Sequence, residues 1–336
     1  MDARIAVLGA GANGASIGAD LIAAGHDVTL VEQWPAHVES MRADGLRIRM
    51  VDRELHVHPR VIHVCEVAGL REPFDVVLLV MKAYDTRWAS ELIAPHVAAD
   101  GVVAAVQNGM TTDAVADVAG RARAVGTVIE ISATMSEPGA VHRHTPPEAS
   151  WFAVDADPRA DRVAALLATS GRVERFADIE SAKWMKLVSN CSLLVTTALL
   201  GLPMLDARDV TGMREVMLAA SREALAVGAA RGHEVLPIFG LTATDLGGSA
   251  DVAETLLDAV YGFVRAGATT TVLQDWTKSR RSEAEGLNGL VVREGARLGI
   301  PTPVNARIVE LARRVEGGEL RPAVANAAAL VGAIGR

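Results

Sequence analysis

Residues 5–14 read Ile5-Ala6-Val7-Leu8-Gly9-Ala10-Gly11-Ala12-Asn13-Gly14. An apolar run typical of a buried strand leads directly into the spacing GxGxxG, and an amphipathic helical pattern follows. The first glycine of this spacing allows a tight turn, the second lets the backbone approach a pyrophosphate, and the third lets the helix pack on the strand. Free N–H groups at the helix N-terminus then face the phosphates. We expect all six residues of this turn to bind a dinucleotide cofactor.

The next predicted strand ends at Glu32. A carboxylate at this place accepts hydrogen bonds from the adenosine ribose hydroxyls and repels a 2′-phosphate, and neither Gln33 nor Trp34 offers a positive charge for such a phosphate. This pattern favours NAD over NADP. Two alternatives remain open. Glu32 could be an ordinary solvated carboxylate in a loop, and Arg42 or Arg53 could fold back and reverse the cofactor preference.

Apolar β-type runs alternate with helical patterns through the first half of the chain. They lie at Arg4–Leu8, Val28–Val31, Val76–Val80, Val102–Val106 and Ala124–Ile131. Runs that are apolar on both faces and separated by helices predict a parallel sheet covered on both sides, which is a doubly wound α/β domain of the Rossmann type. Further strands are expected at Leu46–Val57 and around the turn at Pro138-Gly139, both as hairpins, and at Trp151–Val154 and Arg172–Phe176.

The pattern changes at Asp178, a plausible N-cap, because β-type runs end there and a 3.6-residue periodicity begins. We therefore expect a dinucleotide-binding domain over residues 1–177 and an all-helical substrate and dimerisation domain over residues 178–336. The predicted helices lie near 178–200, 208–231, 251–281, 283–298, 303–316 and 322–334.

Charge and length exclude several classes of protein. The formal net charge of −8 offers no basic surface for nucleic acid or anionic lipid. The stretch Leu187–Leu205 approaches transmembrane length, but polar residues, a glycine and a proline interrupt it, so we expect a buried helix there. No secretory signal precedes the first strand. The expectation is a cytoplasmic protein whose partner is a small molecule.

Neither a disulfide nor a metal site is expected. Cys65 and Cys191 stand far apart without CxxC or Cys/His spacing. His56 with His58, and His142 with His144, each share one strand face but lack a third ligand in register.

Polar residues also follow two other strands of the predicted sheet. Lys82 and Asn108 stand at carboxyl ends of strands, where open α/β sheets bind ligands. Each has a simpler interpretation, since Lys82 resembles a surface lysine and Asn108, before Gly109, resembles a turn residue. In the helical half, Lys183, Lys186 and Asn190 share one helix face and enter an apolar run, where they need partners.

At this point the sequence resembles the ketopantoate reductases (2-dehydropantoate 2-reductases), whose motifs occur in the same order along nearly the whole chain. The N-terminal motifs are the glycine turn, Met81-Lys82-Ala83 and Gln107-Asn108-Gly109-Met110. The C-terminal motifs are Lys183-Trp184-Met185-Lys186-Leu187 with Asn190-Cys191, Leu273-Gln274-Asp275, Arg281-Ser282-Glu283, Leu287-Asn288-Gly289 and Gly299-Ile300-Pro301-Thr302-Pro303-Val304-Asn305.

The resemblance implies a helical domain of the 6-phosphogluconate dehydrogenase C-terminal type and hydride transfer from NAD(P)H to a small 2-oxo acid or related carbonyl held between two domains. It makes Lys186 the general acid, and an ammonium suits this role because it stabilises the developing alkoxide and attracts a carboxylate. Glu283 would lie near the cofactor and Lys186 and help to orient them. The other implied residues are Asn108 for cofactor and substrate, Asn190 and Thr271 for substrate, Lys82 for the cofactor, and Ser132 for its nicotinamide end.

The chain departs from the family pattern at several substrate positions. Leu194 and Val195 stand where the family carries a second asparagine and a proline, and Met204 stands near another family asparagine. Thr270 and Thr271 replace a serine pair, keeping the hydroxyl and adding a methyl group. Because Leu194 cannot bind a substrate hydroxyl, a more apolar oxo substrate is an alternative.

Other functions remain open from the sequence alone. An enzyme of the same fold could act on an imine or oxidise a secondary alcohol, and a non-catalytic nicotinamide sensor is a further alternative. Lys186 and Glu283 together argue against a sensor, because binding requires neither. Large apolar runs at Val216–Leu225 and Ala323–Ile334 suggest a homodimer formed through the helical domain.

Overall fold

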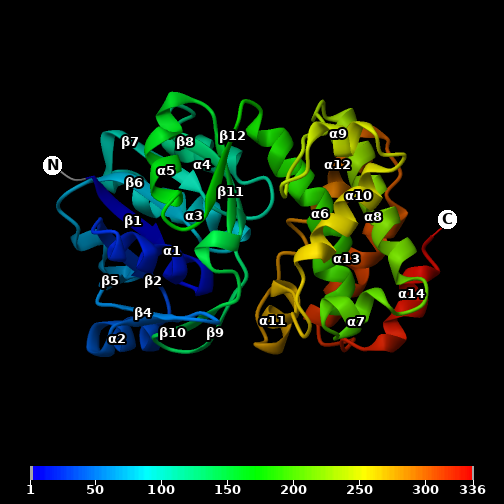
Figure 1. The fold of residues 1–336 in the computed structure, drawn as a ribbon, viewed down its shortest axis with the longest axis horizontal. Helices are drawn as coiled ribbons and strands as arrows, with labels where there is room; N and C mark the ends of the chain where they lie inside the picture. Colours follow the sequence, from blue (N-terminus) through cyan, green and yellow to red (C-terminus); the bar gives the residue numbers. More distant parts are fainter. Residues whose placement is uncertain (1–2, 335–336) are drawn as a thin grey trace. The chain divides into compact units, whose positions relative to one another are not determined.

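The opening stretch forms strand β1 (Arg4–Leu8) and the first turn of helix α1 (Ala12–Ala23). The computed structural model describes residues 3–334. It divides into two units, Met1–Ile179 and Glu180–Arg336, and each has a hydrophobic core of its own (Figure 1). The division lies two residues beyond the predicted boundary at residue 177.

An eight-stranded sheet organises the first unit, in the order β12-β11-β8-β7-β6-β1-β2-β5. Its other strands are β2 (Asp27–Glu32), β5 (Arg60–His63), β6 (Phe74–Leu79), β7 (Val97–Ala105), β8 (Ala124–Glu130), β11 (Trp151–Asp155) and β12 (Arg172–Phe176). Neighbouring strands pair in parallel across the part of the sheet that runs β8-β7-β6-β1-β2-β5. Strand β11 pairs antiparallel with β8. The predicted doubly wound parallel sheet is confirmed, while β5 is a strand that the sequence patterns did not predict.

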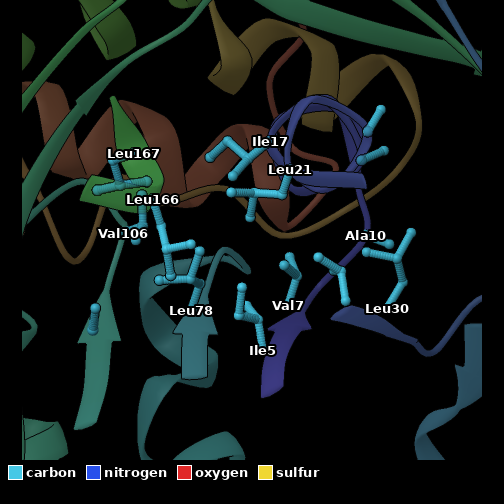
Figure 2. Close-up of a cluster of buried hydrophobic side chains, with 14 of the residues drawn as sticks. Ile5, Val7, Ala10, Ile17, Leu21, Leu30, Leu78, Val106, Leu166 and Leu167 are labelled. Carbon is cyan, nitrogen blue, oxygen red and sulfur yellow. The ribbon is translucent and has the colours of Figure 1, made fainter. Parts of the chain in front are cut away.

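Helices cover both faces of this sheet. Alternate residues of β1 point to opposite faces, so Ile5 packs with α1 and α5 (Asp161–Leu167), whereas Ala6 packs with α3 (Thr86–Ile93) and α4 (Thr112–Ala119). Figure 2 shows the first of these cores, where side chains of α1 lie against those of β1 and β6.

A second, four-stranded sheet packs against α1, in the order β4-β3-β10-β9. Its strands are β3 (Leu46–Arg49), β4 (Glu54–Val57), β9 (Ala133–Glu137) and β10 (Ala140–Arg143). Both predicted hairpins are confirmed, since β3 pairs antiparallel with β4 and β9 with β10. The hairpins join through a parallel pairing of β10 with β3, which no local pattern indicates.

A buried ion pair ties the small sheet to α1. Arg143 of β10 is 1% exposed and donates a hydrogen bond to Asp20 of α1, and its Nη2 also donates to the backbone oxygen of Ser170 at 2.6 Å. The hydroxyl of Ser170 donates to the same Asp20 carboxylate. Because an unpaired charge at this depth is costly, these partners must come together as a set.

The remaining elements of this unit are short. They are α2 (Pro35–Asp44) and the 3-10 turns η1 (Val64–Gly69), η2 (Ala83–Asp85), η3 (Ala94–His96), η4 (Pro147–Ala149) and η5 (Pro158–Ala160).

The second unit is helical throughout the residues that the structure describes. Its elements are α6 (Ile179–Leu200), α7 (Met204–Arg208), α8 (Met213–Ala230), α9 (Ala243–Gly247), α10 (Val252–Phe263), α11 (Thr271–Thr277), α12 (Asn288–Leu298), α13 (Pro303–Glu316), η6 (Val324–Asn326) and α14 (Ala327–Val331). The predicted long buried helix is α6. Within residues 3–334, no helix combines the length and the apolar character needed to cross a bilayer.

Several predicted helices are wrong in extent. The predicted helix over 251–281 is broken between α10 and α11, where Gly267 has a φ of 77° and the Thr270 hydroxyl caps α11. Gly212, with a φ of 81°, separates α7 from α8, so the predicted helix over 208–231 starts at Met213. The predicted helix over 283–298 begins only at Asn288, and the one over 322–334 is shortened to η6 and α14.

A polar network lies at the centre of the helical core. The side-chain amide of Asn288 donates to the backbone oxygen of Cys191 at 3.0 Å and to Oδ1 of Asn305 at 2.8 Å. The carboxylate of Glu223 accepts the backbone N–H groups of Val304 and Asn305, and so caps α13. These bonds fix α12 and α13 against α6 and α8.

The apolar runs that suggested a homodimer are largely used inside this unit. Val216 and Met217 are fully buried, and Leu330 is also fully buried in the same core. Dimerisation therefore stays a prediction, and these runs no longer support it.

Candidate functional site

The predicted cofactor residues of the first unit share one edge of the large sheet. The glycine turn follows β1, Glu32 ends β2, Lys82 follows β6, and Asn108 follows β7. These strands are parallel neighbours, so their carboxyl ends meet at the same edge. From β1 the chain continues through β2 to β5 on one side, and then crosses to β6 on the other side of β1 and continues to β7 and β8. The strand order therefore reverses between β1 and β6, which is the switch point where doubly wound sheets bind dinucleotides.

The glycine turn has the shape that a pyrophosphate site requires. Gly9 has a φ of 88°, and a Cβ there would lie 2.9 Å from the backbone nitrogen of Met81. A Cβ on Gly14 would lie 1.9 Å from the carbonyl oxygen of Gly9, so only glycine lets α1 sit this close. Gly11 is different, because a Cβ there would meet nothing within 4 Å. The close contacts at Gly9 and Gly14 fix the conformation of the turn, and a ligand can approach the backbone at Gly11.

The N-terminus of α1 is suited to an anion. Gly11 is its N-cap, no side chain caps it, and its first turn carries no acidic residue. The Oδ1 atom of Asn13 is buried and finds no hydrogen-bond partner among the residues that the structure describes. The pyrophosphate of a dinucleotide would accept from the backbone N–H groups, and one of its ribose hydroxyl groups could donate to this amide oxygen, so the residues present fit the predicted cofactor.

Two residues to which the sequence patterns assigned no role, Gln107 and His37, hold the loops at this edge together. Gln107 is buried, and its Nε2 donates to the carbonyl oxygen of Met81 at 2.8 Å, which joins the loops after β6 and β7. His37 of α2 is fully buried, with Nε2 2.9 Å from the carbonyl oxygen of Ala10, while Nδ1 accepts from the backbone N–H of Gly139. Burial lowers the pKa of His37, which keeps the ring neutral, so that one nitrogen donates a hydrogen bond and the other accepts one.

Glu32 is 7% exposed, so it is not the solvated loop carboxylate of the simpler interpretation. Its Oε1 accepts the backbone N–H groups of Gln33 and Trp34 at 2.8 and 2.9 Å. Two arginines would reverse the cofactor preference by binding a 2′-phosphate, but both form ion pairs with other carboxylates. Arg42 bonds to Glu66 at 2.6 Å, and Arg53 bonds to Glu148 at 2.7 Å.

The other predicted cofactor residues lie along the same edge. Lys82 and Asn108 are each half-buried, and the exposed Ser132 follows β8. Ser132 is held by its backbone N–H, which donates to the hydroxyl of Thr145 at 2.9 Å.

In the helical unit, Lys186 and Asn190 both lie on α6 and are 8% and 4% exposed. Lys186 places its Nζ 4.7 Å from the centroid of the Phe239 ring. Lys183, one turn earlier, is 2% exposed, and burial lowers its pKa to about 8. A buried ammonium beside an amide is the arrangement expected for polarising and protonating a carbonyl oxygen.

The hydroxyl groups of Thr270 and Thr271 differ in their contacts. The hydroxyl of Thr270 donates to the carbonyl oxygen of Leu194 at 2.9 Å and accepts from the backbone N–H of Leu273, so it is structural. It also places the start of α11 against α6, one turn beyond Asn190. Thr271 keeps a buried Oγ1 without a partner within residues 3–334, as a substrate-binding hydroxyl would.

Glu283 lies between α11 and α12 and is 6% exposed. The residue before it is held firmly, since the Oε1 of Glu316 accepts both the hydroxyl and the backbone N–H of Ser282 at 2.6 and 3.0 Å. No local pattern marks Glu316, because it lies on α13, 34 residues beyond Ser282.

The paired histidines belong to no larger cluster of ligating side chains within the described part of the chain. No group of three or more histidine, cysteine, aspartate or glutamate side chains is placed there to hold a metal ion.

Known proteins with similar sequences match both units. The family described as "Ketopantoate reductase PanE/ApbA" matches residues 5–155, and "Ketopantoate reductase PanE/ApbA C terminal" matches residues 178–316. With the glycine turn and the buried lysine, these matches define an NAD(P)-dependent oxidoreductase that acts on a carbonyl or hydroxyl group. The chain belongs to the ketopantoate reductase family.

Individual relatives agree over almost their full length. The 2-dehydropantoate 2-reductase of Caulobacter vibrioides is 31% identical over 91% of this chain and 97% of its own. The enzyme of the same name from Archaeoglobus fulgidus is 28% identical over 94% and 98%.

Solved structures share the fold. A PanE/ApbA family ketopantoate reductase from Ralstonia eutropha JMP134 is 27% identical, covers 94% of this chain and 99% of its own, and has a TM-score of 0.81. A D-mandelate dehydrogenase in complex with NADH and anilino(oxo)acetate has a TM-score of 0.82 at 20% identity over 94% and 99% of the two chains, which is a likeness of fold.

The open side of the glycine turn gives a direct test of cofactor binding. Gly11→Ala should leave the thermal midpoint unchanged, because Gly11 has a φ of −61° that alanine adopts freely and the methyl group meets no atom. The methyl group would nevertheless stand where the pyrophosphate approaches, so the Kd for NADH in a fluorescence titration should rise about tenfold or more. Gly69→Ala, also in open space, is the matched control. An unchanged Kd in Gly11→Ala would show that the cofactor does not use this turn.

Proposed function

We propose that the protein is an NADH-dependent reductase of a small branched 2-oxo acid, with Lys186 as the proton donor. The observation that carries this proposal is the buried ammonium of Lys186 on the same helix face as Asn190. Ketopantoate is the first candidate substrate, because the full-length relatives from Caulobacter vibrioides and Archaeoglobus fulgidus are named 2-dehydropantoate 2-reductases.

The reaction assigns a distinct task to each residue. Reduced nicotinamide supplies the hydride that forms the new C–H bond at the substrate's carbonyl carbon. Lys186 donates a proton to the carbonyl oxygen, which completes the hydroxyl group, and the lysine regains a proton from solvent. Asn190 and the hydroxyl of Thr271 hold the substrate, and Glu283 orients Lys186. Two electrons and two protons are thus transferred, and a 2-hydroxy acid is the product.

Other activities have less support. A nicotinamide-binding sensor would need neither Lys186 nor Glu283, and burying two unused charges would be costly. An imine reductase would not gain from an ammonium placed to stabilise an alkoxide.

The preference for NADH rests on Glu32. Both backbone bonds to this carboxylate end on Oε1, so a ribose hydroxyl would bind at Oε2, and the negative charge would repel a 2′-phosphate. Arg42 and Arg53 form ion pairs with other carboxylates, which supports the same preference, because neither guanidinium group is placed to bind a 2′-phosphate.

Glu32→Gln tests this preference with little disturbance, since the amide oxygen still accepts the two backbone N–H groups. The parent protein should show a higher kcat/KM with NADH than with NADPH. In Glu32→Gln that ratio should fall about tenfold, because the repulsion of the 2′-phosphate is removed. Glu54→Gln, an exposed carboxylate on β4, is the control. A parent protein that turns over faster with NADPH would overturn the assignment.

Lys186→Ala should reduce kcat at least about 100-fold, because general acid catalysis contributes this much or more. The Kd for NADH should stay within about twofold of the parent value, since Lys186 is assigned to the substrate. Steady-state oxidation of NADH with ketopantoate and shorter or bulkier 2-oxo acids measures the first quantity, and fluorescence titration measures the second.

Lys183→Met provides the comparison, because it removes a buried ammonium one helical turn away. If Lys183 rather than Lys186 supplied the proton, Lys183→Met would be the variant that loses turnover. Equal turnover in Lys186→Ala and the parent would rule out the mechanism.

Leu194 gives a test of how the substrate is bound. It stands one helical turn after Asn190, at a position where the family usually carries an asparagine. It is half-buried, whereas every other residue from Ser181 to Leu200 is buried. A substrate hydroxyl would lack a partner here.

Leu194→Asn should raise kcat/KM for ketopantoate about tenfold, because a good hydrogen bond to a substrate hydroxyl contributes this much. Trimethylpyruvate, which is ketopantoate without its hydroxyl group, should not gain. The informative quantity is the ratio of the two kcat/KM values in the variant and in the parent. An unchanged ratio would show that the side chain at position 194 does not meet the substrate hydroxyl.

A further inference from the structure

An aromatic ring lies against the ammonium of Lys186. Phe239 belongs to the segment between α8 and α9, 53 residues further along the chain, and its ring centroid is 4.7 Å from Nζ. Both side chains are buried, with Lys186 8% and Phe239 7% exposed. A cation over an aromatic face at this distance is attracted to the ring, and the attraction is stronger where water is excluded.

The backbone at Phe239 is in an unfavourable conformation. Its φ is 61°, and that of the following Gly240 is 79°. The backbone N–H of Leu241 donates to the carbonyl oxygen of Ile238 at 3.1 Å, which closes a tight turn over these two residues. Two successive residues with positive φ are typical of turns that carry Asn-Gly, because a bulky side chain is strained in this region. The chain thus carries phenylalanine where asparagine would be easier to accommodate.

Strain of this kind persists where the surroundings enforce it, and it gathers at functional sites. Within residues 3–334, Phe239 and Ser279 are the two residues other than glycine that have a positive φ. Ser279 is exposed and small, whereas Phe239 is buried and directs its ring at the proposed proton donor. Ordinary core packing would not explain why a strained position holds an aromatic ring.

We propose that Phe239 is a positioning residue for Lys186, held in a strained turn so that its ring fixes the ammonium in place for proton donation. The inference rests on the proposed role of Lys186. A lysine side chain has four flexible bonds, so an ammonium without such a contact samples several positions. A ring on one side of the ammonium restricts its position, and the donated proton leaves from another side.

The experiment separates the ring from the turn. Phe239→Asn suits the positive φ and removes the ring, while Phe239→Tyr keeps the ring at the same strained position. Ser279→Asn relieves the other strained residue without touching Lys186. Each variant is measured for kcat and KM with NADH and its best 2-oxo acid, for thermal midpoint, and for the rate at which formaldehyde and borohydride methylate Lys186, followed by mass spectrometry.

We expect Phe239→Asn to have a kcat about tenfold lower and an unchanged Kd for NADH. Its thermal midpoint should fall, because the loss of a buried ring costs more than the relief of the strained φ returns. Methylation of Lys186 should be faster, because the ring no longer covers the ammonium. Phe239→Tyr should keep kcat within about twofold, and Ser279→Asn should match the parent in kcat and in methylation.

Unchanged methylation of Lys186 in Phe239→Asn would overturn the contact, and faster methylation with unchanged kcat would overturn the positioning role. A kcat as low in Phe239→Tyr as in Phe239→Asn would also overturn the positioning role, because Phe239→Tyr keeps the ring beside Lys186. Failure of the proposed function has a different signature, because Lys186→Ala would then retain turnover whatever happens at Phe239.

Discussion

The contact between Gly14 and the carbonyl oxygen of Gly9 is the constraint on which the first unit depends. A single added carbon at Gly14 would lie 1.9 Å from that oxygen, so α1 can rest on the end of β1 only with glycine at this position. This seat directs the positive end of the helix dipole at the sheet edge. It also presses Ile17 and Leu21 of α1 into the core formed with β1 and β6, as Figure 2 shows. One close approach therefore sets both the packing of α1 and the shape of the turn that is predicted to bind the cofactor.

The parts of the fold that could be predicted are those with a local signal. Buried strands such as β1 and β6, the hairpin turn at Gly139 and the long helix α6 each carry a period or a turn residue of their own. The break between α10 and α11 was missed because a glycine inside a helical pattern does not by itself show that its φ is positive, as that of Gly267 is. The edge strand β5 has only four residues, too few for a period to stand out.

For the site, sequence reasoning named the residues with chemical roles, which stay predictions, and missed those that hold them. Glu32 was expected from residue type and position, and the role of Lys186 from the family resemblance. His37, Phe239 and Glu316 act through contacts with segments distant in the chain, and no local pattern marks such contacts. Some motif residues also proved structural: Asn288 and Asn305 bond to one another at the centre of the helical core. A family motif thus mixes residues kept for chemistry with residues kept for packing.

The buried pair of Asp20 and Arg143 has a consequence for synthesis on the ribosome. Asp20 belongs to the first helix made, yet its partners Arg143 and Ser170 follow 123 and 150 residues later. Until the last of them has left the exit tunnel, the carboxylate of Asp20 cannot be buried without leaving a charge unsatisfied. The glycine turn can be made early, but the unit that surrounds it closes only when nearly all of its residues have been translated.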